Sequence, residues 1–248
     1  MKQSLITIIM AAGMGKRMKS DLPKVLHKLA GRPLVHHVIE QAKNIGSSRI
    51  LLIIGHKREL VIEQTQNMGV EWIVQEQQLG TGDAIKVCES ALTGYTGDVL
   101  ILSGDVPLLR KSTIEQAWEL HKRSNAAATD FTFIPDTAKG YGRVVRGEKD
   151  ELLRIVEEKD ATTDELKINE VNAGIYFFKS ELMYRALEEI KNDNASGEYY
   201  LTDTISVLEK WGEPLAAFLV EDPLEVAGVN TVEQLSHLEE EFIARKRT

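Results

Sequence analysis

The fold of this chain is indicated first by the stretch Ile9-Met10-Ala11-Ala12-Gly13-Met14-Gly15-Lys16-Arg17-Met18, which leads into Leu22-Pro23-Lys24. It begins as a short apolar strand over residues 5–10 and breaks into a loop of small residues with three cations. Small side chains let backbone N–H groups approach an anion closely, and successive N–H groups form a concave anion site. Fixed positive charges can then hold the outer phosphates of a triphosphate. The stretch therefore predicts a strand followed by a nucleotide-phosphate loop.

Two common kinds of phosphate loop do not fit this stretch. A Walker loop requires Ser or Thr directly after its Gly-Lys pair, and here Arg17 follows Gly15-Lys16. A dinucleotide-binding fingerprint requires a third Gly or Ala, and Met18 takes that place. From these residues alone, a glycine-rich turn with solvated cations remains the alternative to a phosphate site.

The composition is that of an ordinary globular chain with an acidic balance. Its 248 residues are enough for one large core, with 43% hydrophobic and 27% charged residues. A formal net charge of −8 argues against a nucleic-acid surface, which needs a basic face. No apolar run reaches membrane-spanning length, and the first residues lack a signal-peptide pattern. The single cysteine, Cys88, has helical spacing with apolar neighbours, so we expect a buried core thiol in a cytoplasmic protein.

The first half of the chain alternates between strand and helix patterns. Apolar runs with branched side chains predict buried parallel strands at residues 50–54, 70–74 and 99–102. Helical spacing of apolar residues predicts helices at residues 34–45, 60–68 and 83–92. This alternation predicts an α/β fold with a mostly parallel central sheet and helices on both faces.

The second half is less regular, and we expect it to elaborate the same domain, spanning residues 1–248. A hairpin is predicted from strands at 143–145 and 152–156, with a turn at 147–150, and another strand at 171–178. Helices are predicted at residues 180–190, 201–210 and 232–245.

The opening stretch also carries a family resemblance. Ala11-Ala12-Gly13-x-Gly15-x-Arg17-Met18, followed by Pro23-Lys24, resembles the signature of the sugar-nucleotidyltransferases. The longer match Ser20-Asp21-Leu22-Pro23-Lys24-Val25-Leu26-His27 is similar to the uridylyltransferase domain of bacterial N-acetylglucosamine-1-phosphate uridylyltransferases. The resemblance implies a Rossmann-like, GT-A-like nucleotidyltransferase fold with a smaller β-containing elaboration that binds the sugar.

The resemblance assigns roles on the nucleotide side. It implies that Arg17 and Lys24 are the catalytic cations that neutralise the phosphates. It also implies nucleotide contacts from Met10, Ala11, Ala12, Gly13, Gln75, Gly80, Thr81, Ser103 and Gly104.

Asp105 closely follows the apolar run at residues 99–102. Because ligands of open α/β sheets bind beyond the carboxyl ends of the strands, this acid is placed to face a ligand, and its hard oxygen suits Mg²⁺. A turn-forming Asp before Val106-Pro107 is the alternative. The family's Gly-Asp-x-Pro-Leu segment, matched at residues 104–108, implies that Asp105 is a Mg²⁺ ligand.

Asn230 precedes the last predicted helix. Either Asn230 or Thr231 could cap that helix, with Glu233 or Gln234 completing a capping box. The resemblance implies that Asn230 is the second protein ligand of Mg²⁺. The two roles are compatible, since Thr231 can cap the helix while Asn230 faces inward.

Gln75 ends the strand predicted at residues 70–74, and Leu79-Gly80-Thr81-Gly82 opens the next helix. A side-chain amide can accept from uracil N3–H while donating to O4, but a flipped amide could read cytosine. The residue alone therefore does not choose the base, and a plain helix start is the alternative. The pattern Gln-x-x-x-Leu-Gly-Thr-Gly resembles the family's uridine-binding segment.

Three segments in the second half resemble the family's sugar side: residues 140–143, 156–160 and 170–174. They imply sugar contacts from Gly142, Glu157 and Asn172, and residues 196–203 match a further segment near the sugar. Without the resemblance, each segment would be a turn or a solvated loop. Two positions depart from the family, which usually has Tyr at Ser103 and Thr at Ala173, and these departures leave the choice of sugar open.

The resemblance implies a Mg²⁺-dependent transfer of UMP from UTP to N-acetyl-α-D-glucosamine 1-phosphate, giving UDP-N-acetylglucosamine and pyrophosphate for cell-envelope precursors. The substrates would be the only partners expected, with no nucleic acid and no membrane, and the oligomeric state is open. The alternatives are a nucleotidyltransferase for another acceptor and a non-catalytic nucleotide-sugar sensor. Because no hexapeptide-repeat left-handed β-helix follows residue 248, acetyltransferase activity is expected to be absent.

Overall fold

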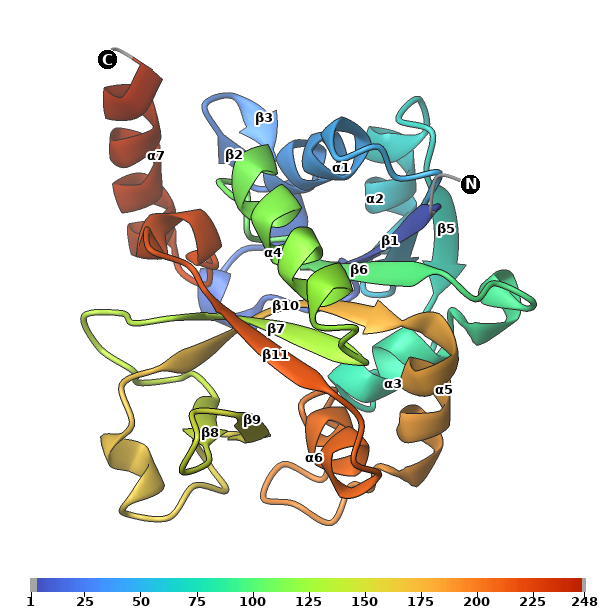
Figure 1. Ribbon diagram of the computed structural model, residues 1–248. Helices are drawn as coiled ribbons and strands as arrows, with labels where there is room; N and C mark the ends of the chain where they lie inside the picture. Colours follow the sequence, from blue (N-terminus) through green and yellow to red (C-terminus); the bar gives the residue numbers. More distant parts are fainter. Residues whose placement is uncertain (1–3, 247–248) are drawn as a thin grey trace.

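The centre of the molecule is a nine-stranded, mostly parallel sheet (Figure 1). The computed structural model describes residues 4–246, without the side chains of Lys16, Arg245 and Lys246. Strand β1 (Leu5–Met10) pairs in parallel with β4 (Arg49–Ile54) on one side and with β6 (Asp98–Ser103) on the other. These strands are largely apolar and buried, as expected for parallel strands that are covered on both faces.

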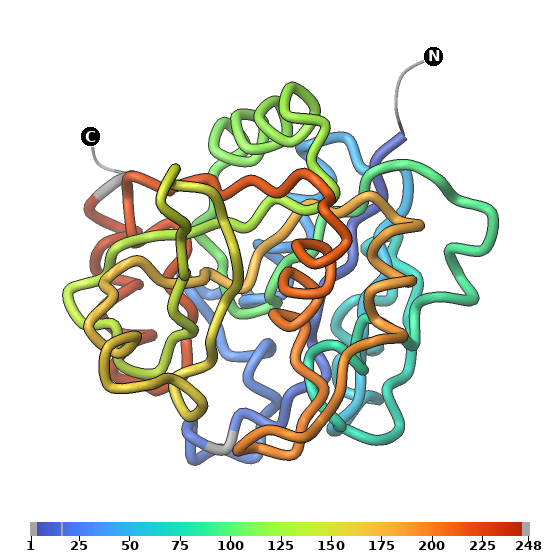
Figure 2. The backbone as a smooth tube through the Cα atoms, turned by 60° about the horizontal axis from the view of Figure 1, so that its bottom comes forward, coloured from blue at the N-terminus to red at the C-terminus, as the bar shows by residue number. Residues whose placement is uncertain are grey.

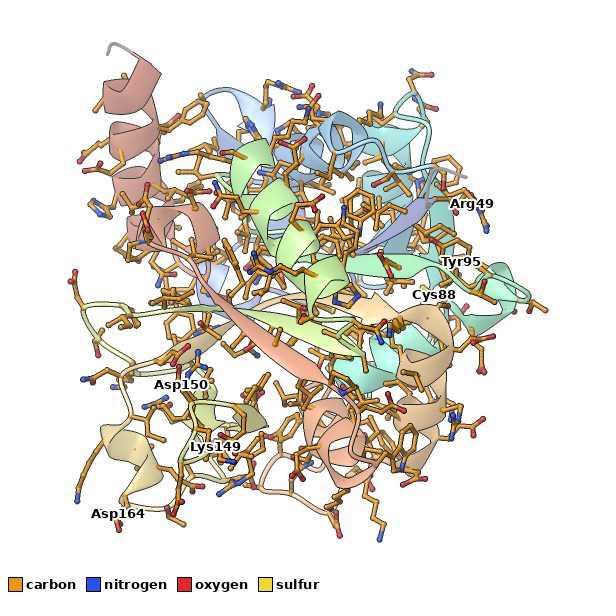
Figure 3. The ribbon with its side chains drawn as sticks, in the orientation of Figure 1. Arg49, Cys88, Tyr95, Lys149, Asp150 and Asp164 are labelled. Carbon is orange, nitrogen blue, oxygen red and sulfur yellow. The ribbon has the colours of Figure 1, made fainter. Side chains whose placement is uncertain are left out.

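The other strands extend this centre in the order β11-β7-β10-β6-β1-β4-β5. Their bounds are β5 (Glu71–Val74), β7 (Ala128–Phe133), β10 (Val171–Lys179) and β11 (Leu215–Leu219). Strand β10 is antiparallel to β6 and β7, whereas β4–β5 and β7–β11 are parallel pairs. A hairpin of β8 (Arg143–Arg146) and β9 (Leu152–Val156) joins the sheet through β10, and Lys149 and Asp150 mark its turn in Figure 3. A separate small sheet pairs β2 (Lys28–Leu29) with β3 (Arg32–Pro33).

Helices cover both faces of the large sheet. One face packs on α1 (Leu34–Asn44), α2 (Arg58–Thr65) and α4 (Lys111–Arg123) through one apolar cluster. The other face packs on α3 (Thr81–Lys86), α5 (Ser180–Glu189), α6 (Asp203–Lys210) and the β8–β9 hairpin through a second cluster. Helix α7 (Val232–Lys246) stands at the side of the molecule and belongs to a third, smaller cluster. The predicted α/β architecture is thereby confirmed.

Two sequence predictions need correction. Residues 70–74 were expected to form a buried strand, but β5 is an edge strand in which Trp72 is 37% and Val74 36% exposed. Among residues 4–246, β4 is the only strand that pairs with it, so β5 is covered less completely than the central strands. The helix expected at residues 83–92 begins earlier and ends at Lys86, and a 3₁₀ turn follows at Glu89–Leu92. The apolar residues keep their inward spacing through that tighter turn, so the pattern alone could not reveal the break.

Helix α4 and strands β7 and β11 were not predicted. All six residues of β7 are buried although three of them, Thr129, Asp130 and Thr132, are polar, so the strand lacks an apolar run. Cys88, labelled in Figure 3, is fully buried as predicted, and burial raises the pKa of its thiol to about 12.

Candidate active site

The opening loop starts where the central strands end. The backbone N–H of Ala11 donates to Ile53 O, and the N–H of Gly104 donates to Met10 O, both at 2.9 Å. These bonds hold the ends of β1, β4 and β6 together at one edge of the sheet. A Cβ at Gly104 would lie 2.9 Å from Met10 O, so the close approach of these strand ends requires glycine there.

The loop after β1 leaves several backbone donors free. The N–H groups of Gly13, Met14 and Gly15 donate to no acceptor in the part of the chain that the structure describes. Gly15 has a φ of +60°, and a Cβ there would lie 2.7 Å from Lys24 Cβ, so only glycine lets the loop fold back on Lys24. A bend with free N–H groups can bind an anion.

The last helix supports this loop from outside. Met18, at the end of the loop, is 1% exposed. It belongs to the same apolar cluster as Leu29, Val229 and, on α7 itself, Leu238. The carboxylate of Glu239 on α7 also accepts from the backbone N–H of Ala30 at 2.8 Å. Residues more than 200 positions apart therefore share in shaping the loop.

Four polar side chains from distant segments meet beside the loop. Lys24 Nζ donates to Asp105 Oδ2 at 2.6 Å and to Asn230 Oδ1 at 3.1 Å. Arg17 donates to the same oxygen of Asn230 at 2.8 Å. Asp105 is only 9% exposed, and a buried carboxylate needs such a compensating charge. The sequence named these four residues separately, and the structure places them in one cluster.

The same cluster fits a divalent cation. The ammonium of Lys24 bonds one carboxylate oxygen and one amide oxygen, and hard oxygens of this kind are the ligands of Mg²⁺. A Cβ on Gly228 would lie 3.2 Å from Asp105 Oδ2 and 3.7 Å from Asn230 Nδ2, so the absence of a side chain there leaves room beside both residues. Within residues 4–246 no group of three or more His, Cys, Asp or Glu side chains could hold a metal ion. A cation here would therefore need water or substrate oxygens as further ligands.

Thr231 and Gln234 cap the start of α7, one of the arrangements that the sequence allowed. Gln234 Oε1 accepts from the N–H groups of Asn230 and Thr231 at 2.8 and 3.1 Å, and the Gln234 N–H donates to Thr231 Oγ1 at 3.2 Å. This reciprocal pattern is a capping box. It leaves the Asn230 side chain free to face the cluster.

A cavity of about 350 Å³ lies at the carboxyl end of the strands. Ten of the predicted site residues line it: Met10, Ala11, Ala12, Gly13, Lys24, Gln75, Gly80, Thr81, Ser103 and Asp105. Six others were not among the predicted site residues: Met14, Val25, Ile53, Gln78, Ala84 and Glu198, of which Glu198 belongs to the segment at residues 196–203 that the resemblance placed near the sugar. In the view of Figure 2, the backbone around residue 198, in orange, passes next to the opening stretch of the chain, in blue, and both segments contribute to the lining of this cavity. Arg17, Gly104, Gly142, Glu157, Asn172 and Asn230 are outside this lining.

The segment at residues 75–82 is fixed by a partner far along the chain. Gly80 has a φ of +125°, and a Cβ there would lie 2.4 Å from Tyr199 O, so this position requires glycine. Thr81 Oγ1 accepts from the N–H of Leu201 at 2.9 Å. Just before this bend, Gln75 is 5% exposed and its Nε2 donates to Asp83 Oδ2 at 2.7 Å.

The three predicted sugar residues gather between the hairpin and β10. The N–H of Asn172 donates to Gly142 O at 2.9 Å, and a Cβ on Gly142 would lie 3.5 Å from Glu157 Oε1. The Asn172 amide is fixed, since it donates to Tyr176 Oη at 2.6 Å and accepts from the Gly174 N–H at 2.7 Å. The pairing of β10 with β7 shifts register between Asn172 and Tyr176. This irregular stretch carries Asn172 beside Gly142 and the hairpin.

Carboxylates dominate this second region. Burial raises the pKa of Glu157, although the Thr202 hydroxyl donates to it at 3.0 Å. Burial, together with the charges of Asp160 and Asp193, raises the pKa of Asp203 to about 6. Glu157, Asp160, Asp193 and Asp203 all line a separate cavity of about 260 Å³. The region around Glu157 is therefore rich in hydrogen-bond acceptors, whereas the loop after β1 presents hydrogen-bond donors.

The two regions meet at Ser103, which lines the larger cavity. Its Oγ would lie 3.6 Å from a Cβ on Gly174, the residue that bonds to Asn172. One of the two departures from the family's pattern is thus at the junction, and the other, Ala173, directly precedes Gly174.

Comparison with known proteins identifies the family to which this chain belongs. The sequence profile of the family described as nucleotidyl transferase matches residues 6–223. This chain belongs to the nucleotidyl transferase family. A protein of Exiguobacterium sp. strain AT1b called bifunctional protein GlmU is 47% identical over 241 residues, 97% of this chain and 53% of that protein. A protein of Geobacter metallireducens with the same description is 46% identical over 233 residues, 94% of this chain and 49% of its own length. This chain spans about half the length of these relatives.

Solved structures support the fold of this nucleotidyl transferase. UDP-glucose pyrophosphorylase complexed with UDP-glucose superposes with a TM-score of 0.77 at 17% identity, covering 98% of this chain and 99% of the other. The apo form of UDP-glucose pyrophosphorylase gives the same TM-score at 19% identity and the same coverage. At these identities the likeness concerns the fold alone. No helix among residues 4–246 is both long and apolar enough to cross a membrane.

Proposed function

We propose that this nucleotidyl transferase moves UMP from UTP to N-acetyl-α-D-glucosamine 1-phosphate, releasing pyrophosphate and forming UDP-N-acetylglucosamine. The observation that carries the proposal is the cluster in which one ammonium, Lys24 Nζ, bonds both Asp105 and Asn230 beside a loop of free N–H groups. A protein that only held a nucleotide sugar would not need two phosphate-neutralising cations together with two metal-ligating oxygens. Relatives that share almost half of their aligned residues with this chain, and are called bifunctional protein GlmU, support the choice of substrates.

The chain's own residues would act by position and charge. The acceptor's phosphate oxygen is already ionised at neutral pH, so it can attack the α-phosphorus of UTP without a general base. The free N–H groups of Gly13 and Gly15 would bind the phosphates from one side. Arg17 and Lys24 would neutralise charge that develops on the departing pyrophosphate.

Asp105 and Asn230 would hold Mg²⁺. When bound, the ion supplies charge neutralisation and a common anchor for the two phosphates. Lys24 now occupies this position, so its ammonium would have to leave Asp105 and turn towards the phosphates. The Lys24 side chain is only 20% exposed, which confines that movement to the site.

A screen of pyrophosphate release tests the proposal directly. The four nucleoside triphosphates are each combined with a panel of sugar 1-phosphates and Mg²⁺. We expect UTP with N-acetylglucosamine 1-phosphate to give the highest kcat/KM, and TTP to be the closest competitor because thymine shares the imide edge. A higher kcat/KM for another sugar would move the assignment to that acceptor. Nucleotide binding without any pyrophosphate release would instead identify a sensor.

A further inference from the structure

The amide of Gln75 is held in one orientation. Its Nε2 donates to Asp83 Oδ2 at 2.7 Å and reaches Gly80 O at 3.4 Å. An ionised carboxylate and a backbone carbonyl can only accept hydrogen bonds, so the nitrogen of the amide must face them. Turning the amide over would place Oε1 against Asp83 and create a repulsive oxygen pair in a nearly buried position. The side chain is 5% exposed.

The other amide atom is left for a ligand. Among residues 4–246, no donor bonds to Gln75 Oε1, and the side chain lines the 350 Å³ cavity. A free carbonyl oxygen can accept a hydrogen bond but cannot donate one. Uracil and thymine offer N3–H as a donor to this oxygen. Cytosine carries no hydrogen on N3, and its donor on this edge is the exocyclic N4 amine, so cytosine would have to shift in the cavity to reach Oε1.

We propose that Asp83 is a positioning residue that sets base specificity, because it locks Gln75 with its acceptor towards the base and so selects uracil over cytosine. The inference rests on the proposed function in taking the base to lie against Gln75. Asp83 itself is half-buried in the first turn of α3 and lines the neighbouring cavity rather than the 350 Å³ one. It acts through Gln75 and touches no substrate.

A purely structural role for Asp83 makes a different prediction. An acidic residue in the first turn of a helix stabilises that helix through its dipole. Removing the charge would then lower the melting temperature and weaken both pyrimidine nucleotides alike. The ratio between UTP and CTP separates the two roles, because only a change in the amide's orientation alters that ratio.

The test compares wild type, Asp83→Asn, Asp83→Ala and Glu188→Gln. Asparagine has the shape of aspartate but can donate to Gln75 Oε1, which permits the flipped amide. The ratio of kcat/KM for UTP to that for CTP should fall by about tenfold or more in Asp83→Asn, and the absolute turnover of CTP should rise. The reason is that a substrate which leaves buried polar groups of the site unpaired is strongly rejected, and the flipped amide would remove this penalty for CTP. Asp83→Ala removes the lock and should lower the ratio too. Glu188 lines the same neighbouring cavity as Asp83 and bonds to neither Gln75 atom, so Glu188→Gln should keep the ratio.

Calorimetric dissociation constants for UTP and CTP provide the same ratio without turnover. An unchanged ratio in folded Asp83→Asn and Asp83→Ala overturns the inference, even if pyrophosphate release supports the proposed function. Equal affinity of the wild type for UTP and CTP overturns it as well. If the wild type prefers UTP in binding but releases no pyrophosphate with any acceptor, the proposed function fails, and the shift in binding ratio still decides the role of Asp83.

Discussion

The region that we propose to bind phosphates (the phosphate side) and the region that we propose to bind the sugar (the sugar side) are built in opposite ways. The phosphate side uses backbone N–H groups at the ends of central strands and two cations, Arg17 and Lys24. The sugar side is a hairpin and an irregular stretch of β10 that gather carboxylates, among them Glu157 and Asp203. One region favours anions, and the other presents acceptors for hydroxyl groups.

Under the proposed function, this difference would let the protein bind the two ends of a sugar nucleotide in a fixed direction. Arg17 and Lys24 would attract phosphates, whereas the carboxylates of the second region would accept hydrogen bonds from sugar hydroxyls. We therefore expect charge to help order the substrates along the site. Each region also has its own weak point, which the following predictions address.

Asp105→Asn should have the largest effect, on the phosphate side. It keeps the shape but removes the negative charge that Lys24 now neutralises and that a cation would need. Turnover should fall at least about a hundredfold, or about 2.7 kcal/mol in the barrier, and recover in part at high Mg²⁺. Pyrophosphate release across a Mg²⁺ titration measures this. Asp164→Asn, on the exposed loop labelled in Figure 3, is the matched control. Near-normal turnover with normal Mg²⁺ dependence in the folded variant would reduce Asp105 to a turn residue.

Lys24→Ala should lower turnover to a similar degree without recovery at saturating Mg²⁺, because added Mg²⁺ cannot replace the positive charge with which Lys24 would bind the phosphates. In the free protein the same change should strengthen Mn²⁺ binding, since the ammonium no longer competes for Asp105 and Asn230. Electron paramagnetic resonance of free Mn²⁺ reports that affinity. Lys28→Ala, which removes an exposed lysine nearby, should alter neither quantity. Unchanged Mn²⁺ affinity in Lys24→Ala would contradict the exchange of ammonium for metal.

Glu157→Gln should affect the sugar side alone. The KM for the sugar phosphate should rise about tenfold, the value of one charge-assisted hydrogen bond, while the KM for UTP stays within error. Burial raises the pKa of Glu157, and the ionised form is the stronger acceptor. As pH falls through that raised pKa, the wild-type KM for the sugar should rise at a higher pH than an ordinary glutamate would cause. Glu148→Gln, in the exposed hairpin turn, is the control. A parallel rise in both KM values would break the division between the two sides.

Asp203→Asn should have the smallest effect, on stability. The pKa of Asp203 is about 6 in the folded protein against an ordinary value of 3.8. Because the folded state binds this proton more tightly, stability from Asp203 is full below about pH 3.8 and is lost as pH rises through about 6. The variant should therefore melt higher than wild type at pH 8 and together with it near pH 4. Glu209→Gln, exposed on the same helix, supplies the baseline. A melting difference that is independent of pH would contradict the assigned cause.

The same contrast explains which features of the site could be predicted from the sequence. The phosphate side depends on a short stretch, so its loop and cations were visible in residues 9–24, and the central strands followed from apolar runs. The support of Met18 by α7 was invisible, because it joins the two ends of the chain. On the sugar side, each segment alone is an ordinary polar loop, and only the family resemblance singled out Gly142, Glu157 and Asn172.

Some features could not be read from sequence at all. Strand β7 carries buried polar residues and has no apolar run, so no periodicity marks it. The bond from Gln75 to Asp83 joins a strand end to a helix start, and Asp83 alone looks like a helix-stabilising acid. Pairwise side-chain geometry of this kind needs coordinates.

A crystal structure with UDP-N-acetylglucosamine and Mg²⁺ tests the division of the site most directly. The account predicts the metal between Asp105 and Asn230, Lys24 Nζ released from its 2.6 Å bond to Asp105, and the sugar beside Glu157 and Asn172. A bound product with the sugar away from the hairpin, or with Lys24 still paired to Asp105, would contradict it.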